Sequence, residues 1–399
     1  MSTAAYAVQQ QGCGSTRKLR VAVLNRVFAA TGGGAERYSI ALVENLADRH
    51  ELHVFAQQIE HDWPGVTYHR VPTLLQKPRW FNQLWFAAWT WWWTRHYFDV
   101  VHSHENTWHG NVQTVHVLPV KYNLFNNRNG LALALRWLKV VTSPRLLVYL
   151  KMERCRYAVL PLRQVVVTSE SLRDVMASTY PACVAALSVV TPGFDPPADA
   201  VSSDKLIAQS VARGRLALPK TGICLLLVAN DFRKKGLTTI LEALAKLPPH
   251  HILAVVGSRL QMPEFRRQIF RLNLSARVFF LGQLPDVSGA YRAANYLLHP
   301  TLEDTFAMVV LEAMAFGLPV LVSGPEHCGI AGLLLHQVNA WLLNDPRNPD
   351  EMMDAIMTLD ADPGLRQTLS NNAIGFAAGY RWKAIAQSQE VIYSAAAGF

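Results

Sequence analysis

Residues 299–319 read HPTLEDTFAMVVLEAMAFGLP, and this stretch decides the fold. A short apolar strand ends at His299 and leads into a polar turn, after which an apolar helix runs to Gly317, Leu318 and Pro319. Strand, turn and helix in this order are typical of parallel α/β domains. Two acids, Asp304 and Glu312, are eight residues apart across the start of the helix.

We expect the helix to begin directly after Asp304, so that the first backbone amides are unpaired and able to bind phosphate. These are the amides of Thr305, Phe306 and Ala307. Glu312 would lie about 12 Å further along at 1.5 Å per residue. One extended ligand, such as a nucleotide-sugar, could then contact Asp304 with its hexose and Glu312 with its ribose. The alternative is that Asp304 is only an N-cap and Glu312 an exposed helix residue.

Apolar strands alternate with helices in two series along the chain, which predicts two α/β doubly wound domains. The first series is residues 20–24, 52–55, 66–70, 100–102, 113–116 and 165–168; the second is 224–228, 251–256, 278–281, 296–299 and 320–322. We predict a disordered tail over residues 1–18, a first domain over 19–191, a linker over 192–200, a second domain over 201–375 and a last helix over 376–399.

Composition and charge narrow the class of partner. The 399 residues are 50% hydrophobic and 17% charged, enough for two packed cores. Residues 1–200 hold 20 Lys and Arg against 13 Asp and Glu, most of the net charge of +9. Because no nucleic-acid-binding signature is present, we expect no nucleic acid partner and favour an anionic membrane or a phosphorylated glycolipid. A basic surface without a partner is the alternative.

The cysteines and the apolar stretches indicate in which compartment of the cell the protein would be found and whether it would contact a membrane. The five cysteines lack CxxC or Cys/His clustering, which argues against disulfides and zinc and indicates a reducing cytosol. The polar N-terminus does not resemble a signal peptide. Residues 80–94 and 131–150 are too short or too interrupted by charge to span a membrane. Their aromatic and basic residues suit an interface, so peripheral membrane contact is one interpretation and interior packing is the other.

Residues 304–320 resemble the Glu-x7-Glu motif of the family 4 retaining glycosyltransferases, with an almost complete match from Val309 to Val320. The chain departs from the family at the first acid, where Asp304 replaces Glu and Glu303 stands just before it. The resemblance implies that the first acid contacts the donor sugar and that Glu312 contacts the ribose. Either Asp304 or Glu303 could fill the first role.

The resemblance covers nearly all of the chain after residue 18, and its closest form is similar to the bacterial lipopolysaccharide-core glucosyltransferases. It implies the GT-B fold, in which two Rossmann-like domains face each other across the active site. The donor would bind to the C-terminal domain and the acceptor to the N-terminal one. Tyr380, Arg381 and Trp382 resemble the family's C-terminal segment, whose helix crosses back to the first domain.

Two further motifs resemble segments that bind the donor phosphates in this family. Residues 33–37, Gly-Gly-Ala-Glu-Arg, match a family loop in which backbone amides approach the donor phosphate; an ordinary tight turn is the alternative. In residues 231–236, Lys235 matches the lysine that contacts the diphosphate, where it would neutralise the leaving group. Asn230 stands where the family has Arg, so Arg233 or Lys234 must substitute if two cations are needed. A solvated basic turn is the alternative.

His116 ends a strand and matches the family's active-site histidine, although His104 is close in sequence and any of these histidines could be structural. From motif and resemblance together we assign catalytic roles to Asp304, Lys235 and His116, and acceptor binding to Glu36 and His104. Donor binding is assigned to Gly33, Gly34, Arg233, Lys234, Glu303, Thr305, Phe306, Ala307, Glu312 and Gly257. We expect no metal and no cofactor.

The expected activity is a retaining, metal-independent transfer of a hexose from UDP-glucose or a relative to a lipid-linked or polysaccharide acceptor, such as a lipopolysaccharide core. Its place would be the cytoplasm, at the cytoplasmic face of the inner membrane. Two alternatives stay open: a nucleotide-sugar epimerase of similar two-domain shape, and a carbohydrate- or membrane-binding scaffold without activity.

Overall fold

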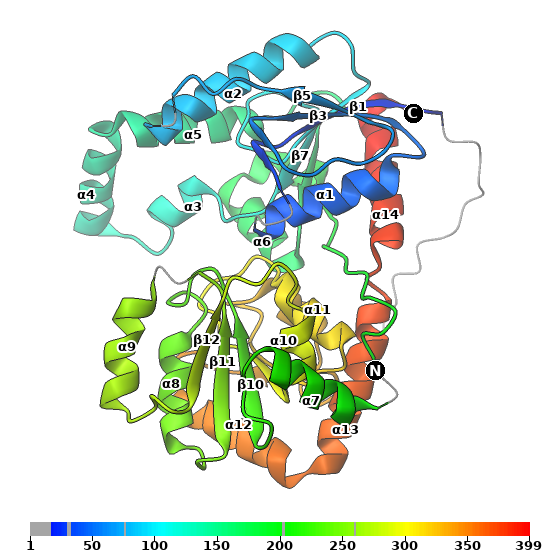
Figure 1. The fold of residues 1–399 in the computed structure, drawn as a ribbon. Helices are drawn as coiled ribbons and strands as arrows, with labels where there is room; N and C mark the ends of the chain where they lie inside the picture. The colour runs from blue at the N-terminus through cyan, green and yellow to red at the C-terminus, as the bar shows by residue number, and fades with distance from the viewer. Residues whose placement is uncertain (1–16, 30–32, 76, 202–203, 259–260) are drawn as a thin grey trace, which may run out of the picture.

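The chain folds as two α/β domains, each built around one parallel sheet (Figure 1). The computed structural model describes residues 17–29, 33–75, 77–201, 204–258 and 261–399. The predicted disordered tail therefore lies outside the described residues except for Arg17 and Lys18. Of these, Arg17 lies over the Phe399 ring at 5.0 Å from its centroid.

The first domain contains a seven-stranded sheet in which every neighbouring pair is parallel. Successive strands are added on both sides of β1, which is the doubly wound pattern. In such sheets, ligands bind beyond the carboxyl ends of the strands. The order is β5 (Val66–Arg70), β3 (Glu51–Ala56), β1 (Arg20–Leu24), β6 (Val100–Ser103), β7 (Val112–Val115), β8 (Gln164–Val167) and β9 (Leu187–Val189). A small sheet pairs β2 (Val27–Phe28) with β4 (Gln58–Ile59).

Helices cover both faces of the first sheet. One core contains α1 (Gly34–Leu46) and another contains α2 (Arg79–Thr94), while α6 (Glu170–Thr179) and the 3-10 turn η1 (Pro181–Ala186) lie near β8 and β9. An arm of three helices, α3 (Val120–Phe125), α4 (Gly130–Val141) and α5 (Pro144–Arg156), extends from the domain, with α4 at its outer end (Figure 1).

Helix α2 buries a largely polar face. Asn82 and Gln57 exchange two hydrogen bonds, and Gln83 donates to the carbonyl of Asn106, so these buried amides are paired. Trp92 and Trp93 at the other end of the helix are more than half exposed. The aromatic stripe predicted for residues 80–94 is therefore not interior packing at its C-terminal end.

The second domain contains a six-stranded parallel sheet between two helical layers. The strand order is β12 (Val278–Gly282), β11 (His251–Val256), β10 (Ile223–Val228), β13 (Tyr296–His299), β14 (Val320–Ser323) and β15 (Trp341–Leu343). One layer is α7 (Lys205–Arg215), α10 (Ser288–Ala293), α11 (Met308–Ala315) and α13 (Pro363–Ala378), with the 3-10 turn η3 (Gly329–Leu333); the other is α8 (Leu237–Lys246), α9 (Met262–Arg271) and α12 (Pro349–Ala361).

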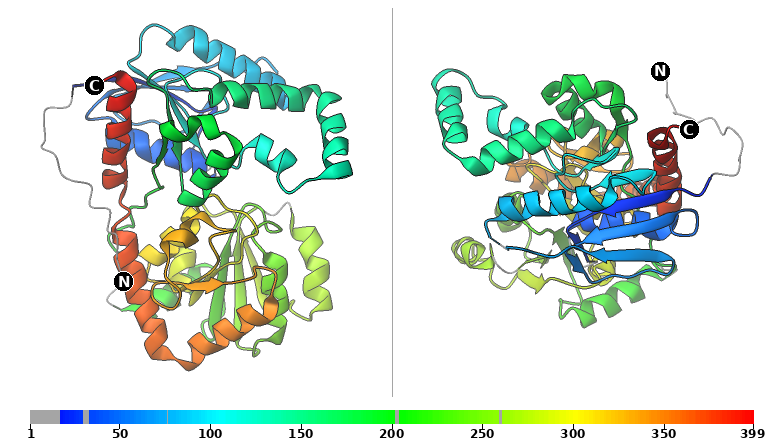
Figure 2. Two further views of the ribbon diagram at one scale, coloured as in Figure 1. Left: turned by 180° about the vertical axis from the view of Figure 1, so that it is seen from behind. Right: turned by 90° about the horizontal axis from the view of Figure 1, so that it is seen from above.

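The last helix, α14 (Trp382–Ala397), leaves the second domain and completes the core of the first. Ile385, Ile392 and Tyr393 are buried there beside α1. The Tyr393 hydroxyl lies 2.8 Å from Nδ1 of His102 on β6. Figure 2 shows α13 and α14 along one side of the molecule, while α4 and α9 lie on the opposite side. The prediction of two doubly wound domains joined by a returning helix is confirmed.

Candidate active site at the domain interface

Three contacts bring the motifs of the two domains together. The Thr305 hydroxyl donates to the carbonyl of His116 at 2.7 Å. Nη2 of Arg37 on α1 lies 3.0 Å from Oε1 of Glu312 on α11. A Cβ on Gly34 would lie 3.5 Å from the sulfur of Met308, the first residue of α11. Residues assigned from separate parts of the sequence therefore meet at one interface.

The start of α11 differs from the prediction. The helix begins at Met308, not directly after Asp304, because Ala307 has a left-handed backbone with φ of 74°. The Phe306 amide donates to Oδ1 of Asp304 at 3.2 Å, so it is not unpaired. The expectation that Thr305, Phe306 and Ala307 form the first turn of the helix was wrong. The N-terminus of α11 is instead beside Gly34.

Lys235 and Asp304 form the centre of the second domain's side of the interface. The Lys235 ammonium contacts Oδ2 of Asp304 at 2.5 Å, the Glu303 carbonyl at 3.1 Å and the Thr301 hydroxyl at 3.3 Å, which uses its three N–H groups. His299 lies 3.2 Å from the same Asp304 oxygen. Burial alone would raise the pKa of Asp304, but the His299 hydrogen bond and the Lys235 charge hold it below its usual range.

Each cation of the loop after β10 has a carboxylate partner. Lys234 pairs with Glu303 at 3.1 Å, and both side chains are largely exposed. Arg233 pairs with Glu264 on α9 at 2.6 Å. Since Asp304 is held by Lys235, Glu303 is the more accessible of the two candidates for the first acidic role. Phosphate contact by these three cations stays a prediction, and it would require exchange of their present partners.

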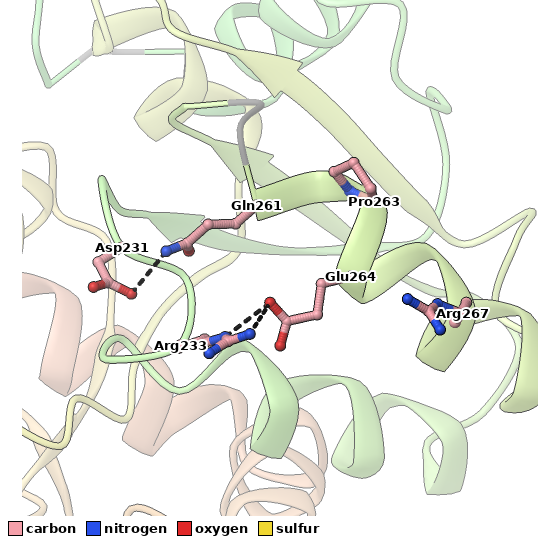
Figure 3. A pocket seen from close by; sticks show the side chains of 6 residues that line it. All are labelled: Asp231, Arg233, Gln261, Pro263, Glu264 and Arg267. Atoms are coloured by element: carbon pink, nitrogen blue, oxygen red, sulfur yellow. Dashed lines mark hydrogen bonds and ion pairs between the residues drawn. The ribbon is translucent and has the colours of Figure 1, made fainter.

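A cavity of about 550 Å³ opens beside this loop (Figure 3). The Asp231 carboxylate accepts from Gln261 at 3.3 Å, next to the Arg233–Glu264 pair. Its lining contains two acids and two arginines, which gives it no net charge and no marked preference for an anion. It is lined by Asp231, Arg233, Gln261, Pro263, Glu264 and Arg267.

Two glycines of the second domain are required by close packing, and one of them, Gly329, lies at the domain interface. A Cβ on Gly257 would lie 1.7 Å from the carbonyl oxygen of Ala229, at a φ of 146° that other residues rarely adopt. A Cβ on Gly329 would lie 2.0 Å from the Thr305 carbonyl and 2.6 Å from the hydroxyl of Ser169 in the first domain. Gly257 therefore has a structural reason to be glycine, and its role in donor binding stays a prediction.

A cluster of buried and partly buried histidines lies on the first domain's side of the interface. Nδ1 of His104 lies 2.9 Å from Nε2 of His116, and the His102 ring lies tilted against the His104 ring with centroids 4.2 Å apart. Burial, together with the charge of Arg156, lowers the pKa of His116 to about 3. Burial and neighbouring charges also hold the pKa of His104 well below its usual range. Both imidazoles are therefore neutral at physiological pH, able to accept or donate one hydrogen bond per nitrogen.

Glu36 lies in the first turn of α1. Its carboxylate oxygen is 3.1 Å from the position of a Cβ on Gly33, so it lies at the start of its own helix, where a negative charge is favourable. This position gives Glu36 a local role in the helix, and acceptor binding by Glu36 and His104 stays a prediction.

Glu312 is buried between the domains. Its Oε2 accepts a hydrogen bond from the Tyr291 hydroxyl at 2.7 Å, and its Oε1 faces Arg37. Sequence analysis identified neither Tyr291 nor His299 as site residues, and Arg37 was only part of a motif. Tyr291 lies 21 residues from Glu312 in a helix without a motif, so no sequence signal marked it. His299 ends a strand directly before the acidic turn, which is a signal that could have been used.

Two family models match the chain, one for each domain. Residues 209–376 match glycosyl transferases group 1, and residues 32–197 match glycosyltransferase family 4. The chain belongs to the glycosyltransferases. The proposed alternatives of an epimerase or a scaffold concern what this glycosyltransferase-family chain does, not the family to which it belongs.

Curated relatives of this glycosyltransferase match about half its length or less. The D-inositol 3-phosphate glycosyltransferase of Corynebacterium jeikeium is 30% identical over 243 residues, 57% of this chain and 56% of that protein. The lipopolysaccharide glucosyltransferase WaaG of Escherichia coli is 30% identical over 156 residues, 38% of this chain and 41% of that protein. The chain thus spans little more than half the length of the curated relatives it matches.

Solved structures show the same fold. The crystal structure of WaaG superposes with a TM-score of 0.79 at 21% identity, covering 95% of this chain and 100% of WaaG. Anabaena HepE in complex with UDP-glucose superposes with a TM-score of 0.73 at 20% identity, covering 94% of this chain and 100% of HepE. The predicted GT-B fold is confirmed, and the likeness at this identity concerns the fold alone.

Because Lys235 and Asp304 form an ion pair, we expect the effects of mutating them on the free energy of unfolding to be strongly non-additive. Lys235→Met leaves the partly buried Asp304 without its cation, and Asp304→Asn leaves Lys235 without its anion. Each should lower the free energy of unfolding by somewhat less than about 3–5 kcal/mol, the loss for a fully buried pair. The double variant should lose clearly less than the sum. Urea unfolding measures these values. The exposed pair Lys246–Asp350 is the control, where Lys246→Met and Asp350→Asn should each change stability by less than about 1 kcal/mol. Additive losses at Lys235 and Asp304 would contradict the coupling.

Because some histidines are buried, we expect the free energy of unfolding to decrease at acid pH. Burial lowers the pKa of His102 and of His109 to about 3, whereas unfolded histidine titrates near pH 6.5. Between these values the unfolded chain binds more protons, so stability falls as pH drops below about 6.5, by up to about 1.4 kcal/mol per pH unit per histidine. His109→Leu should therefore weaken this dependence in urea unfolding at pH 7, 6 and 5. Exposed His96→Leu should leave it unchanged; equal slopes for both variants would contradict the assignment.

Proposed function

We propose that this glycosyltransferase moves a hexose from a nucleotide-sugar, UDP-glucose or a relative, to a hydroxyl of a lipid-linked or polysaccharide acceptor such as a lipopolysaccharide core. The observation that carries the proposal is that three residues of the first domain contact the acidic segment of the second. Gly34 lies against Met308, the His116 carbonyl accepts from Thr305, and Arg37 pairs with Glu312. The HepE complex with UDP-glucose and the name of WaaG support the choice of donor and acceptor.

Binding and charge compensation would supply most of the catalysis. The diphosphate would lie between Gly34 and the N-terminus of α11, where backbone amides and the helix dipole favour negative charge. Lys235 would stabilise charge on the leaving group by exchanging its weaker contacts, to Thr301 and the Glu303 carbonyl, for phosphate oxygens. Neutral His116 would hydrogen-bond the transferred sugar. We propose retention of configuration and no need for a divalent metal ion.

Glu312 would bind the ribose of the donor. It is buried, and one of its oxygens is held by Tyr291, so its carboxylate is fixed in direction. A fixed carboxylate beside the N-terminus of α11 can accept hydrogen bonds from a ribose diol while the phosphates contact the helix. Glu303 or Asp304 would orient the hexose, with Glu303 the more accessible.

Binding of UDP, GDP, ADP and their glucose forms should be measured by calorimetry with EDTA present. We expect the wild type to select one nucleotide and Glu312→Gln to bind it at least tenfold more weakly, since a hydrogen bond to a charged group is lost. Asp354→Asn on α12, far from the interface, is the matched control. Absence of binding to every nucleotide would contradict the donor site.

Assays of turnover distinguish the proposed transferase from the epimerase and from the scaffold. Transfer of labelled hexose to a lipopolysaccharide-core acceptor would support the proposed reaction, and the anomeric configuration of the product would test retention. Interconversion of free nucleotide-sugars would point to the epimerase. Binding without turnover would favour the scaffold, an outcome in keeping with the engagement of Asp304 by Lys235.

We also propose peripheral contact with an anionic membrane at the cytoplasmic face. Helix α4 presents apolar and basic side chains together, with Leu131 76% and Leu135 59% exposed beside Lys139. No described helix is long and apolar enough to cross a membrane. Helix α9, on the same side of the molecule as α4 (Figures 1 and 2), exposes Phe270 and three arginines. These are Arg266, Arg267 and Arg271, all of them exposed.

The membrane contact is tested by sedimentation with vesicles. Wild type should bind vesicles that contain phosphatidylglycerol and not those of pure phosphatidylcholine, because both apolar and charge contributions are needed. Leu135→Ser with Leu138→Ser should reduce binding about tenfold or more. The control replaces Leu206 and Ile207 by Ser; both lie on α7 and are more exposed than Leu135 and Leu138. Equal loss in both double variants would contradict a specific role for α4.

A further inference from the structure

Helix α9 of the second domain presents four exposed side chains on its outer face. Arg266 and Phe270 are four residues apart, as are Arg267 and Arg271, and side chains at this spacing are neighbours on the surface of a helix. The Phe270 side chain is 76% exposed. The helix therefore packs one face on the core of its domain and presents a face to solvent that is both aromatic and basic.

These four side chains, together with Glu264, line a cavity of about 620 Å³. Glu264 is the one acid among the described lining residues, and its carboxylate is turned toward Arg233, which it contacts at 2.6 Å (Figure 3). Arg233 lines the neighbouring cavity and not this one. The charge of Glu264 is thus balanced from outside, and three arginines give this cavity an excess of positive charge that favours an anionic group.

The exposed phenyl ring favours a lipid over a small soluble anion. A free phosphate ion would contact the guanidinium groups and leave Phe270 in water. A phospholipid supplies a phosphate group, which arginine binds through paired hydrogen bonds. It also supplies apolar chains next to that phosphate, where an aromatic side chain is stable. A lipid headgroup therefore accounts for both the charge and the exposed ring.

Helix α9 lies on the same side of the molecule as α4 of the first domain, so that one bilayer could contact both helices (Figures 1 and 2). The two helices differ in what they expose. Most exposed side chains of α4 are apolar, among them Leu131, Leu135 and Leu138, whereas three of the four on the outer face of α9 are arginines. The two contacts would therefore use different physical interactions.

We propose that the cavity on α9 binds the phosphate group of an anionic membrane lipid, with Phe270 next to the acyl chains. The inference rests on the proposed membrane contact and divides it between the domains, with the apolar contribution mainly from α4 and the electrostatic one mainly from α9. Salt screens exposed charges but does not weaken the burial of apolar side chains. Most of the dependence on salt and on anionic lipid therefore resides in the second domain.

The test is sedimentation with phosphatidylcholine vesicles that contain increasing fractions of phosphatidylglycerol, at low and at high salt. Arg266→Gln with Arg271→Gln should weaken binding about tenfold or more at low salt and remove most of the gain from phosphatidylglycerol. Phe270→Ser should weaken binding at both salt concentrations. The matched control is Arg215→Gln with Lys220→Gln, two exposed cations elsewhere in the same domain, which should keep the affinity and salt dependence of the wild type.

Unchanged salt dependence in the double variant of α9, or an equal loss in the control, would overturn the inference. Free glycerol phosphate should not displace the protein from vesicles, and displacement at concentrations similar to that of the lipid would show a site for a soluble phosphate instead. A wild type that binds no vesicles would overturn both this site and the contact through α4. The transferase proposal is decided separately, by the calorimetry with nucleotides, in which all of these variants should match the wild type.

Discussion

The interface of the second domain depends on one partly buried ion pair, between Lys235 and Asp304. The pair joins the loop after β10 to the loop after β13, and His299 contacts the same carboxylate. The Asp304 backbone in turn accepts from the Gly329 amide at 2.9 Å and donates to the His327 carbonyl at 2.8 Å. Three loops are therefore held by one residue, and the surface that they form meets Ser169 and His116 of the first domain.

The two sides of the interface use different electrostatics. The second domain presents cations and carboxylates already paired with each other, whereas the first presents neutral histidines and Arg37. An anionic ligand therefore meets no described unpaired cation in the loop of residues 231–236. It gains affinity through backbone amides and through exchange of partners, which favours ligands that contact several groups at once over simple anions.

The sequence predicted the architecture well because each strand is a short apolar run bounded by turn residues, as at β10 and β13. It failed where tertiary contacts override local preference. Helix α11 starts later than expected because the Asp304 carboxylate binds the Phe306 amide and Ala307 turns left-handed. The partner of Glu312 could not be predicted, since Tyr291 is far away along the chain and has no motif. Likewise, no local pattern indicates that α2 buries Asn82 and exposes Trp92.

The path of α14 has a consequence for how the chain acquires its structure. The core of the first domain includes Ile385, Ile392 and Tyr393, which the ribosome adds only after the entire second domain. His102 on a central strand lacks its Tyr393 partner until then. Domains of multidomain chains generally fold as units in order of synthesis, but here the first domain must wait for the last helix. The domain synthesised second is the first that can fold completely.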